Sequence, residues 1–221
     1  THWRWGQAAD VVVRMPTGAG TAAGPFHSQS NEAWFFHTPG LKIVYPSNPY
    51  DAKGLLCAAL DDPNPYLYFE HKLMYRSIKG EVPDDYYQVE IGKAKLTREG
   101  TQLSILTYGM GVHWAHEILD TLPEVSADVV DLRTLLPWDK EAVTQTVKKT
   151  NRLLILHEDT LTGGIGGEIS AWVSENLFEY LDAPVLRVAG MDTPIPFAPT
   201  LENNFLPKIR LRAAIEKLAG Y

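Results

Sequence analysis

The sequence is poor in cysteine, in basic charge and in long apolar runs. Its single cysteine, Cys57, excludes an intramolecular disulfide, and the apolar run at 55–60 predicts that the thiol packs in a core. Lysine and arginine number 20 against 27 acidic residues, and the net charge of −7 argues against a nucleic-acid partner. No apolar run reaches the ~20 residues of a membrane helix, and the first residues lack a signal-peptide pattern. We therefore expect a cytoplasmic protein with no nucleic-acid and no membrane partner.

The second half of the chain alternates short β-branched runs with amphipathic stretches. This alternation predicts strands that are joined by helices and paired in parallel, an α/β layer structure. Strands are expected at 103–107, 127–131, 152–156 and 185–188, and helices at 112–122, 139–149, 166–181 and 206–218. The polar segment 79–88 before them is typical of an exposed connection between domains.

The first half follows the same alternation but is shorter. Asn48 before Pro49 is a helix-start signal, and Leu60 is expected on the apolar face of that helix. Strands are expected at 9–14, 41–45 and 66–69, and helices at 30–37 and 49–60. So few elements do not complete a parallel sheet. Either sequence upstream of Thr1 supplies the missing strands or another chain covers the gap, and we expect an N-terminally truncated domain.

A run of small residues at 15–24 precedes His27. Such a run is typical of a loop whose backbone passes close to another group. Helical apolar periodicity resumes just after it, at Ala33. An imidazole at this place is suited to proton transfer near neutral pH, although an isolated histidine more often caps or packs a helix start.

Short motifs follow one another along almost the whole chain. They are His27-Ser28-Gln29-Ser30, Pro39-Gly40-Leu41-Lys42, Asp51-Ala52-Lys53-Gly54, Phe69-Glu70, Thr107-Tyr108-Gly109, Asp131-Leu132-Arg133-Thr134, Gly163-Gly164-Ile165-Gly166-Gly167-Glu168 and Asp192-Thr193-Pro194-Ile195-Pro196. Each is weak alone, but their order and spacing are specific. The chain resembles the β subunit of the thiamine-diphosphate-dependent decarboxylase component of 2-oxo acid dehydrogenase complexes.

The resemblance implies a fold and an enzyme activity. Residues 1–78 would be the C-terminal part of a thiamine-diphosphate-binding pyrimidine domain, 79–90 a linker, and 91–221 a transketolase C-terminal-like α/β three-layer domain. A 2-oxo acid would be oxidatively decarboxylated and its acyl group passed to a lipoyl group. Tyr75-Arg76 resembles the branched-chain type, so 2-oxoisovalerate is the expected substrate. Thiamine diphosphate and Mg²⁺ would be shared with an α subunit, and a dihydrolipoyl acyltransferase and a second β copy are further implied partners.

The resemblance also assigns roles at the first loop. His27 matches the family's histidine that serves acyl transfer, where a departing lipoyl thiolate needs a proton. An imidazole with a pKa of about 6.5 is a suitable donor. Ser28 and Gln29 would either orient the ring or a substrate carboxylate, or cap a helix. The family's cofactor-binding glutamate would lie upstream of Thr1, and neither Glu32 nor Glu70 occupies its motif.

A structural potassium ion is implied as well, held largely by backbone carbonyls where a helix ends beside a strand. A helix C-terminus leaves several carbonyls unpaired, and these suit a hard cation. The alternative is an ordinary capped helix end without an ion. The residues concerned are Val11, Ala59, Leu60, Asp62 and Asn64.

Two other patterns are weak evidence for a ligand site. His113 and His116 lie one turn apart on a helix, but no run of ligands completes a metal site, so we expect surface histidines. The glycine loop 163–167 before a helix resembles an anion site, yet Glu168 directly behind it would repel phosphate. The resemblance makes this loop a packing and interface element.

Two alternatives to the dehydrogenase stay open. A transketolase-like enzyme would share the two-domain order, although its signature at the first loop differs from residues 27–30. The chain by itself would otherwise be a non-catalytic assembly or docking module, since 182–197 fits an exposed, rigid surface. We expect the complete protein to be an enzyme and this chain alone to be inactive.

Overall fold

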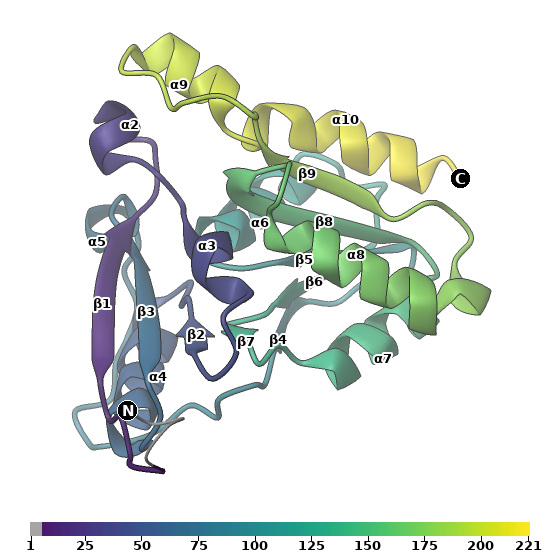
Figure 1. The fold of residues 1–221 in the computed structure, drawn as a ribbon. Coiled ribbons are helices and arrows are strands. Elements are labelled where there is room, and N and C mark those ends of the chain that lie inside the picture. The colour runs from purple at the N-terminus through teal and green to yellow at the C-terminus, as the bar shows by residue number, and fades with distance from the viewer. Residues whose placement is uncertain (1–5) are drawn as a thin grey trace.

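The computed structural model describes residues 6–221, in which two β-sheets share an apolar core (Figure 1). The larger sheet contains β4 (Lys95–Arg98), β5 (Leu103–Thr107), β6 (Ala127–Asp131), β8 (Leu153–Thr160) and β9 (Leu186–Gly190). Its strand order is β4-β6-β5-β8-β9. β4 runs antiparallel to β6, and the other neighbours are parallel.

Helices cover both faces of the larger sheet. They are α6 (Met110–Asp120), α7 (Lys140–Thr150), α8 (Ile165–Asn176) and α10 (Lys208–Ala219). α6 and α10 share one core with Leu103 and Ile105, whereas α7 and α8 share another with Leu106 and Ile155. Successive side chains of a strand point to opposite faces, so each central strand contributes to both cores. The predicted α/β three-layer domain is confirmed.

The observed boundaries follow most of the predicted ones. The strands expected at 103–107 and 127–131 coincide with β5 and β6. The helix expected at 139–149 is α7, and Asp139 caps it: its Oδ1 accepts a hydrogen bond from the backbone N–H of Ala142 at 3.0 Å. The sequence did not predict β4 or α9 (Pro199–Phe205). Both are too short to show a clear hydrophobic period.

The smaller sheet contains β1 (Val12–Thr17), β3 (Tyr66–His71), β2 (Lys42–Val44) and β7 (Thr134–Leu136), in the order β1-β3-β2-β7. The first three strands are parallel, and β7 pairs antiparallel with β2. β7 comes from the second half of the chain. The expectation that only upstream sequence or another chain could supply further strands is therefore wrong for this strand.

The other face of the smaller sheet is covered by α4 (Pro49–Asp61). Asn48 caps this helix as predicted, accepting a hydrogen bond from the N–H of Asp51 at 2.8 Å. Leu60 was expected on the apolar face, but it is 64% exposed and lies on the solvent side. Cys57, expected in the core, is half-buried. Three single turns complete the first half: α2 (Gly24–His27), α3 (Glu32–Phe36) and α5 (Met74–Ser77).

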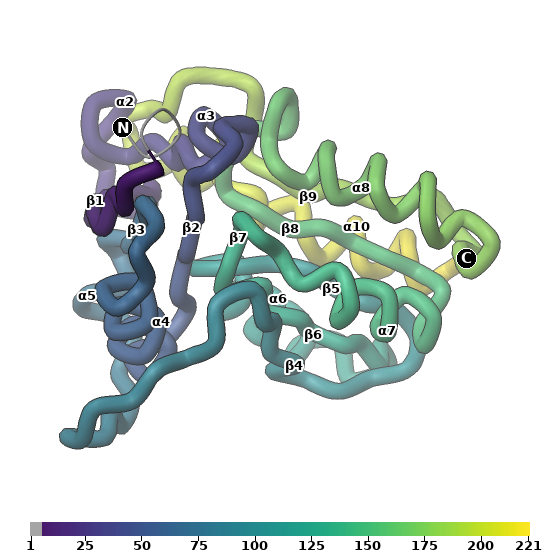
Figure 2. Tube along the Cα trace, turned by 60° about the horizontal axis from the view of Figure 1, so that its bottom comes forward, coloured from purple at the N-terminus to yellow at the C-terminus, as the bar shows by residue number. Residues whose placement is uncertain are grey.

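The segment that joins the two halves runs along α4 before it enters β4 (Figure 2). Lys53 Nζ donates hydrogen bonds to the backbone carbonyls of Asp84 and Asp85, at 3.1 Å and 2.9 Å. Val89 is buried in the core with α4. The segment is thus exposed but tied to the first half of the chain. Within residues 6–221, no helix combines the length and apolar character needed to cross a membrane.

The motif Asp131-Leu132-Arg133-Thr134 joins the two sheets. Ser47 donates a hydrogen bond to the buried Asp131 carboxylate, and Arg133 forms an ion pair with Asp51 across a 3.3 Å Nε–Oδ2 distance. The Arg133 carbonyl also accepts a hydrogen bond from the N–H of Tyr45 at 2.8 Å. Burial raises the pKa of Asp131 to about 6, although its hydrogen bonds oppose the shift.

The two histidines of α6 take part in similar contacts. His113 Nε2 lies 2.7 Å from the Ser47 carbonyl, and His116 Nε2 lies 2.9 Å from Thr97 Oγ1. Both side chains are half-buried. They are therefore packing residues rather than the surface histidines that were expected.

Replacing Asp131 with asparagine should remove a pH dependence of stability. Between its ordinary pKa of 3.8 and the folded value of about 6, the folded protein holds a proton that the unfolded chain lacks. The free energy of unfolding therefore falls as pH rises through this window, by up to about 3 kcal/mol. An asparagine side chain keeps an acceptor oxygen for the Arg133 N–H and cannot titrate, so Asp131→Asn should flatten this part of the curve.

The measurement is urea unfolding at pH 4, 5, 6 and 7. Asp182→Asn, outside the core and away from the Asp131 contacts, is the matched control and should follow the unsubstituted chain. An Asp131→Asn curve parallel to that of the unsubstituted chain would show that Asp131 does not titrate in this window.

Candidate functional site

The largest candidate site lies where the parallel strands β1 and β3 end. A cavity of about 600 Å³ opens at their carboxyl ends, the edge at which open parallel sheets bind ligands. Its size is within the usual range for small-molecule sites. The lining residues are Met15, Pro16, Pro25, Phe26, His27, Gln29, Asn31 and Lys72.

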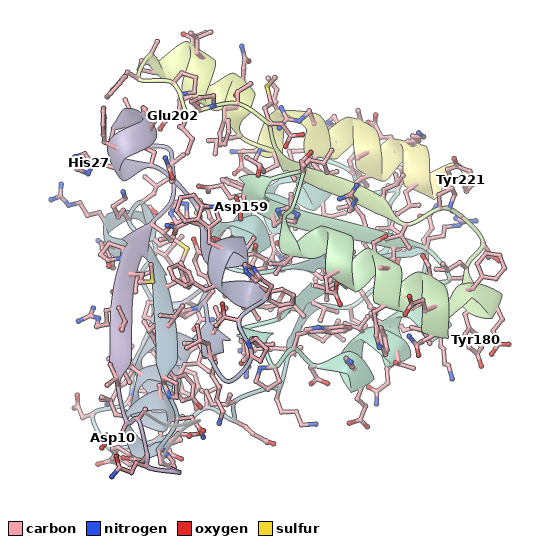
Figure 3. All side chains as sticks on the ribbon, viewed as in Figure 1. Asp10, His27, Asp159, Tyr180, Glu202 and Tyr221 are labelled. Carbon is pink, nitrogen blue, oxygen red and sulfur yellow. The ribbon has the colours of Figure 1, made fainter. Side chains whose placement is uncertain are left out.

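His27 stands at the end of the single-turn helix α2, at the wall of this cavity (Figure 3). Its side chain is exposed, and among residues 6–221 no group hydrogen-bonds its imidazole. Gln29 Nε2 donates to the carbonyl of Pro25 at 2.8 Å, which closes the turn. Ser28 is fully buried, and its Oγ has no hydrogen-bond partner within the described part of the chain. His27 and Gln29 thus reach the cavity, whereas Ser28 lies beneath it.

The loop before α2 has an unusual backbone. Every second residue is left-handed: φ is 94° at Gly18, 92° at Gly20, 54° at Ala22 and 65° at Gly24. Alternation of this kind turns successive N–H groups toward a common concave side, which suits an anion. The loop does pass close to another group, as its composition predicted.

The anions that the N–H groups of this loop bind are carboxylates from the second half of the chain. The N–H of Ala19 donates to Glu158 Oε1 at 2.7 Å. The N–H groups of Gly20 and Ala22 donate to the two oxygens of Glu202, at 3.0 Å and 2.9 Å. Glu158 lies in β8 and Glu202 in α9. Neither carboxylate was singled out from the sequence.

Glu158 is buried and binds three segments at once. Besides Ala19, its carboxylate contacts His71 Nε2 at 2.7 Å and accepts a hydrogen bond from Ser30 Oγ at 3.1 Å. Burial alone would raise the pKa of Glu158. The neighbouring His71 and the hydrogen bonds outweigh burial and lower this pKa.

Glu32 and Asp159 form a second group of buried acidic side chains. Glu32 is fully buried, and Tyr108 donates a hydrogen bond to its Oε1 at 2.7 Å. Burial raises the pKa of both Glu32 and Asp159, and the Asp159 charge raises that of Glu32 further. Glu32 does not line the His27 cavity.

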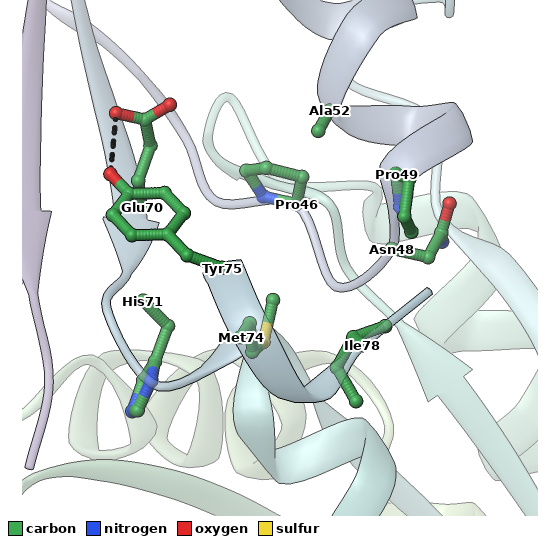
Figure 4. Close-up of a pocket in the computed structure, with 9 residues that line it drawn as sticks. All are labelled: Pro46, Asn48, Pro49, Ala52, Glu70, His71, Met74, Tyr75 and Ile78. Carbon is green, nitrogen blue, oxygen red and sulfur yellow. Dashed lines mark hydrogen bonds between the residues drawn. The ribbon is translucent and has the colours of Figure 1, made fainter. Parts of the chain in front are cut away.

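Glu70 lies beside a smaller cavity of about 200 Å³ between β3, α4 and α5 (Figure 4). Its carboxylate is held by Arg14, with Nη2 2.6 Å from Oε1, and by the hydroxyl of Tyr75 at 3.0 Å. Burial and this hydrogen bond raise the pKa of Tyr75 to about 12. Both oxygens of Glu70 therefore have partners.

The implied potassium site is only partly free for a cation. The Val11 carbonyl accepts a hydrogen bond from the N–H of Tyr66 at 2.8 Å. Burial would raise the pKa of Asp62, but hydrogen bonds from Lys42, Asn64 and Tyr66 lower it to about 2. Lys42 thus already neutralises this carboxylate, and the helix-end carbonyls of Ala59 and Leu60 remain the suitable ligands. Among the described residues, no cluster of three or more histidine, cysteine or acidic side chains could hold a metal.

Replacing Gly18 should lower the free energy of unfolding by more than its left-handed φ alone would cause. A Cβ there would lie 2.3 Å from Nε2 of the buried His71. Gly163 also has positive φ, 76°, but a Cβ there would meet nothing within 4 Å. Gly163→Ala should cost about 1–2 kcal/mol of unfolding free energy for its backbone alone. Gly18→Ala should cost clearly more in the same urea titration, and equal losses would contradict the close packing on His71.

Comparison with known proteins finds two family models that match consecutive parts of the chain. The model described as "Transketolase, pyrimidine binding domain" matches residues 2–77, and "Transketolase, C-terminal domain" matches residues 92–210. A solved structure titled "Split gene transketolase, inactive beta4 tetramer" superposes with a TM-score of 0.76 at 23% identity, and the match covers 95% of this chain and 66% of that one. At this identity the match describes the fold.

Closer sequence relatives are longer than this chain. The 2-oxoisovalerate dehydrogenase subunit beta of Bacillus subtilis (strain 168) is 49% identical over 215 residues, which are 96% of this chain and 66% of the relative. The mitochondrial 2-oxoisovalerate dehydrogenase subunit beta 2 of Arabidopsis thaliana is 44% identical over 214 residues, covering 96% and 59%. The shared fold and the two domain matches show that the chain belongs to the transketolase family, with a pyrimidine-binding domain followed by the transketolase C-terminal domain.

Proposed function

We propose that the complete protein is the β subunit of a thiamine-diphosphate-dependent 2-oxo acid dehydrogenase. The observation that carries this proposal is the placement of His27, an exposed imidazole without a hydrogen-bond partner in the described chain, at a cavity at the carboxyl ends of β1 and β3. The names of the Bacillus and Arabidopsis relatives agree with it.

The lining of the cavity fits part of the cofactor. Met15, Phe26 and the two prolines offer an apolar surface for an aromatic ring, and Gln29 and Asn31 offer polar groups at its edge. No carboxylate of the described residues lines the cavity, so carboxylate ligands for Mg²⁺ would come from outside residues 6–221. When bound, thiamine diphosphate supplies the electron sink for decarboxylation. This chain would therefore provide half of the site.

His27 is the residue that we assign to proton transfer. Neither nitrogen of its ring has a hydrogen-bond partner among the described residues, so either can contact a substrate in the cavity. Acyl transfer forms a bond from the acyl carbon to one lipoyl sulfur while the lipoyl S–S bond breaks. The other sulfur would leave as a thiolate, and protonation of that thiolate by His27 would prevent the disulfide from forming again. Gln29 closes the turn that presents the ring, and Ser28, buried beneath it, would support the turn by packing.

The partner would cover an exposed apolar rim around the site. Phe26 is 81% exposed, Trp34 66% and Phe197 56%, and the rings of Phe26 and Phe197 lie 6.4 Å apart. Exposed aromatic residues clustered beside a cavity are typical of a protein interface. We assign this rim to the α subunit. The dihydrolipoyl acyltransferase, a second β copy, the potassium ion and a cytoplasmic location stay predictions.

The substrate that we propose is 2-oxoisovalerate, since the two relatives reported above carry that name. The alternative of a non-catalytic assembly module is favoured for this chain alone by the outer edge of β1, which pairs with no strand of residues 6–221. Val11 and Val13 beside that edge are 54% and 45% exposed, and an unpaired edge favours association. Decarboxylation by the purified 221-residue chain without an α subunit would contradict the requirement for a second chain.

Substitution of His27 tests the proposal by separating two half-reactions. In the complete protein assembled with an α subunit, His27→Gln should slow acyl transfer from 2-oxoisovalerate to a lipoyl group by about 10²–10⁴-fold, the usual worth of a general acid. Decarboxylation coupled to an artificial dye should persist, because no lipoyl thiolate departs in it.

The matched control is His37→Gln, at another exposed histidine, which should leave both rates unchanged. Equal loss of both half-reactions in His27→Gln would contradict the acyl-transfer role. Faster turnover of pyruvate than of 2-oxoisovalerate by the unsubstituted protein would contradict the substrate assignment alone.

A further inference from the structure

The loop that presents His27 is held by a carboxylate far away in the sequence. Glu202 lies in α9 and is only 3% exposed. Both of its oxygens accept hydrogen bonds from this loop, Oε1 from the N–H of Gly20 at 3.0 Å and Oε2 from that of Ala22 at 2.9 Å. Both oxygens of a buried carboxylate thus bind the backbone ahead of α2.

The Glu202 carboxylate has no cationic partner among the described residues. Within residues 6–221, no lysine, arginine or histidine forms an ion pair with it. A buried carboxylate is costly unless hydrogen bonds replace its hydration. The two N–H groups of the loop supply those bonds, so the positions of Glu202 and of the loop depend on each other.

A second contact from the same region fixes α2 itself. A Cβ at Gly24, the first residue of α2, would lie 2.3 Å from the ring of Phe197, so the backbone of the helix rests on that ring. Phe26 lies against the same ring from the side. α2 and α9 lie at the same corner of the molecule in Figure 1, and Figure 3 places His27 and Glu202 there.

We propose that Glu202 is a positioning residue for His27. Its carboxylate stabilises the curled loop, including the left-handed Ala22 with φ of 54°, which an alanine adopts only at a cost. Without this anion the loop relaxes, and α2 moves together with the imidazole at its end. The C-terminal domain thereby sets the place from which His27 transfers its proton. The inference rests on the proposed function of His27.

Glu202→Gln in the complete protein, assembled with an α subunit, tests this inference. A glutamine accepts from only one of the two N–H groups, because its other terminal atom is a donor. Acyl transfer to a lipoyl group should fall about 10–100-fold, as expected for a displaced catalytic group. Dye-coupled decarboxylation should be unchanged. Amide hydrogen exchange should become faster at residues 24–29, since the two loop N–H groups that Glu202 binds, at Gly20 and Ala22, lie outside that range.

Two further variants complete the test. Glu216→Gln on α10 is the matched control, since Glu216 is exposed and pairs with Arg212 at 3.0 Å. It should change neither the rates nor the exchange. Gly24→Ala places a Cβ against the ring of Phe197, which displaces α2 without touching a buried charge, and should slow acyl transfer in the same selective way. This variant replaces Glu202→Gln in the same measurements if Glu202→Gln does not fold.

The outcomes separate the inference from the function on which it rests. If His27→Gln slows acyl transfer but Glu202→Gln and Gly24→Ala do not, the positioning role is wrong and the function of His27 stands. If Glu202→Gln slows both half-reactions equally, the carboxylate has a general structural role and the inference is also overturned. If His27→Gln leaves acyl transfer intact, the proposed function itself fails.

Discussion

The buried carboxylate of Glu158 is the interaction on which this arrangement most depends. It contacts the N–H of Ala19, the hydroxyl of Ser30 and the ring of His71, so it joins the glycine-rich loop, the segment before α3 and the end of β3 to β8. A group in this position cannot be left without partners, because a buried unpaired charge costs several kcal/mol. The three segments are therefore held together at one point between the two sheets, and the His27 cavity opens beside it.

The two halves of the chain also form one structure elsewhere. β7 leaves the second half to pair with β2, Asp131 and Arg133 contact Ser47 and Asp51, and the core between the sheets is continuous. The C-terminal domain thus does more than cover a sheet. Through Glu158 and Glu202 it shapes the loop that presents His27, so the conformation of one domain sets the geometry of the other.

Local sequence patterns predicted the regular part of this fold and missed its long-range contacts. β5 and β6 and the capped start of α4 follow from period and capping residues, which lie within a few positions of one another. Ala19 and Glu158 are 139 residues apart, and Gly20 and Glu202 are 182 apart, so no periodicity could relate them. His27 itself was predicted from its motif. The glycine run indicated that the loop approaches another group, but not that this group was a carboxylate of the same chain.

We infer that this chain provides half of a thiamine diphosphate site. The most direct measurement is calorimetric titration of thiamine diphosphate with Mg²⁺ into the chain alone, into an α subunit alone, and into their mixture. We expect saturable binding in the mixture only, since the His27 cavity offers a ring surface but, among the described residues, no carboxylate for the metal. Binding to the chain alone with the affinity of the mixture would contradict it, and so would the absence of binding in the mixture.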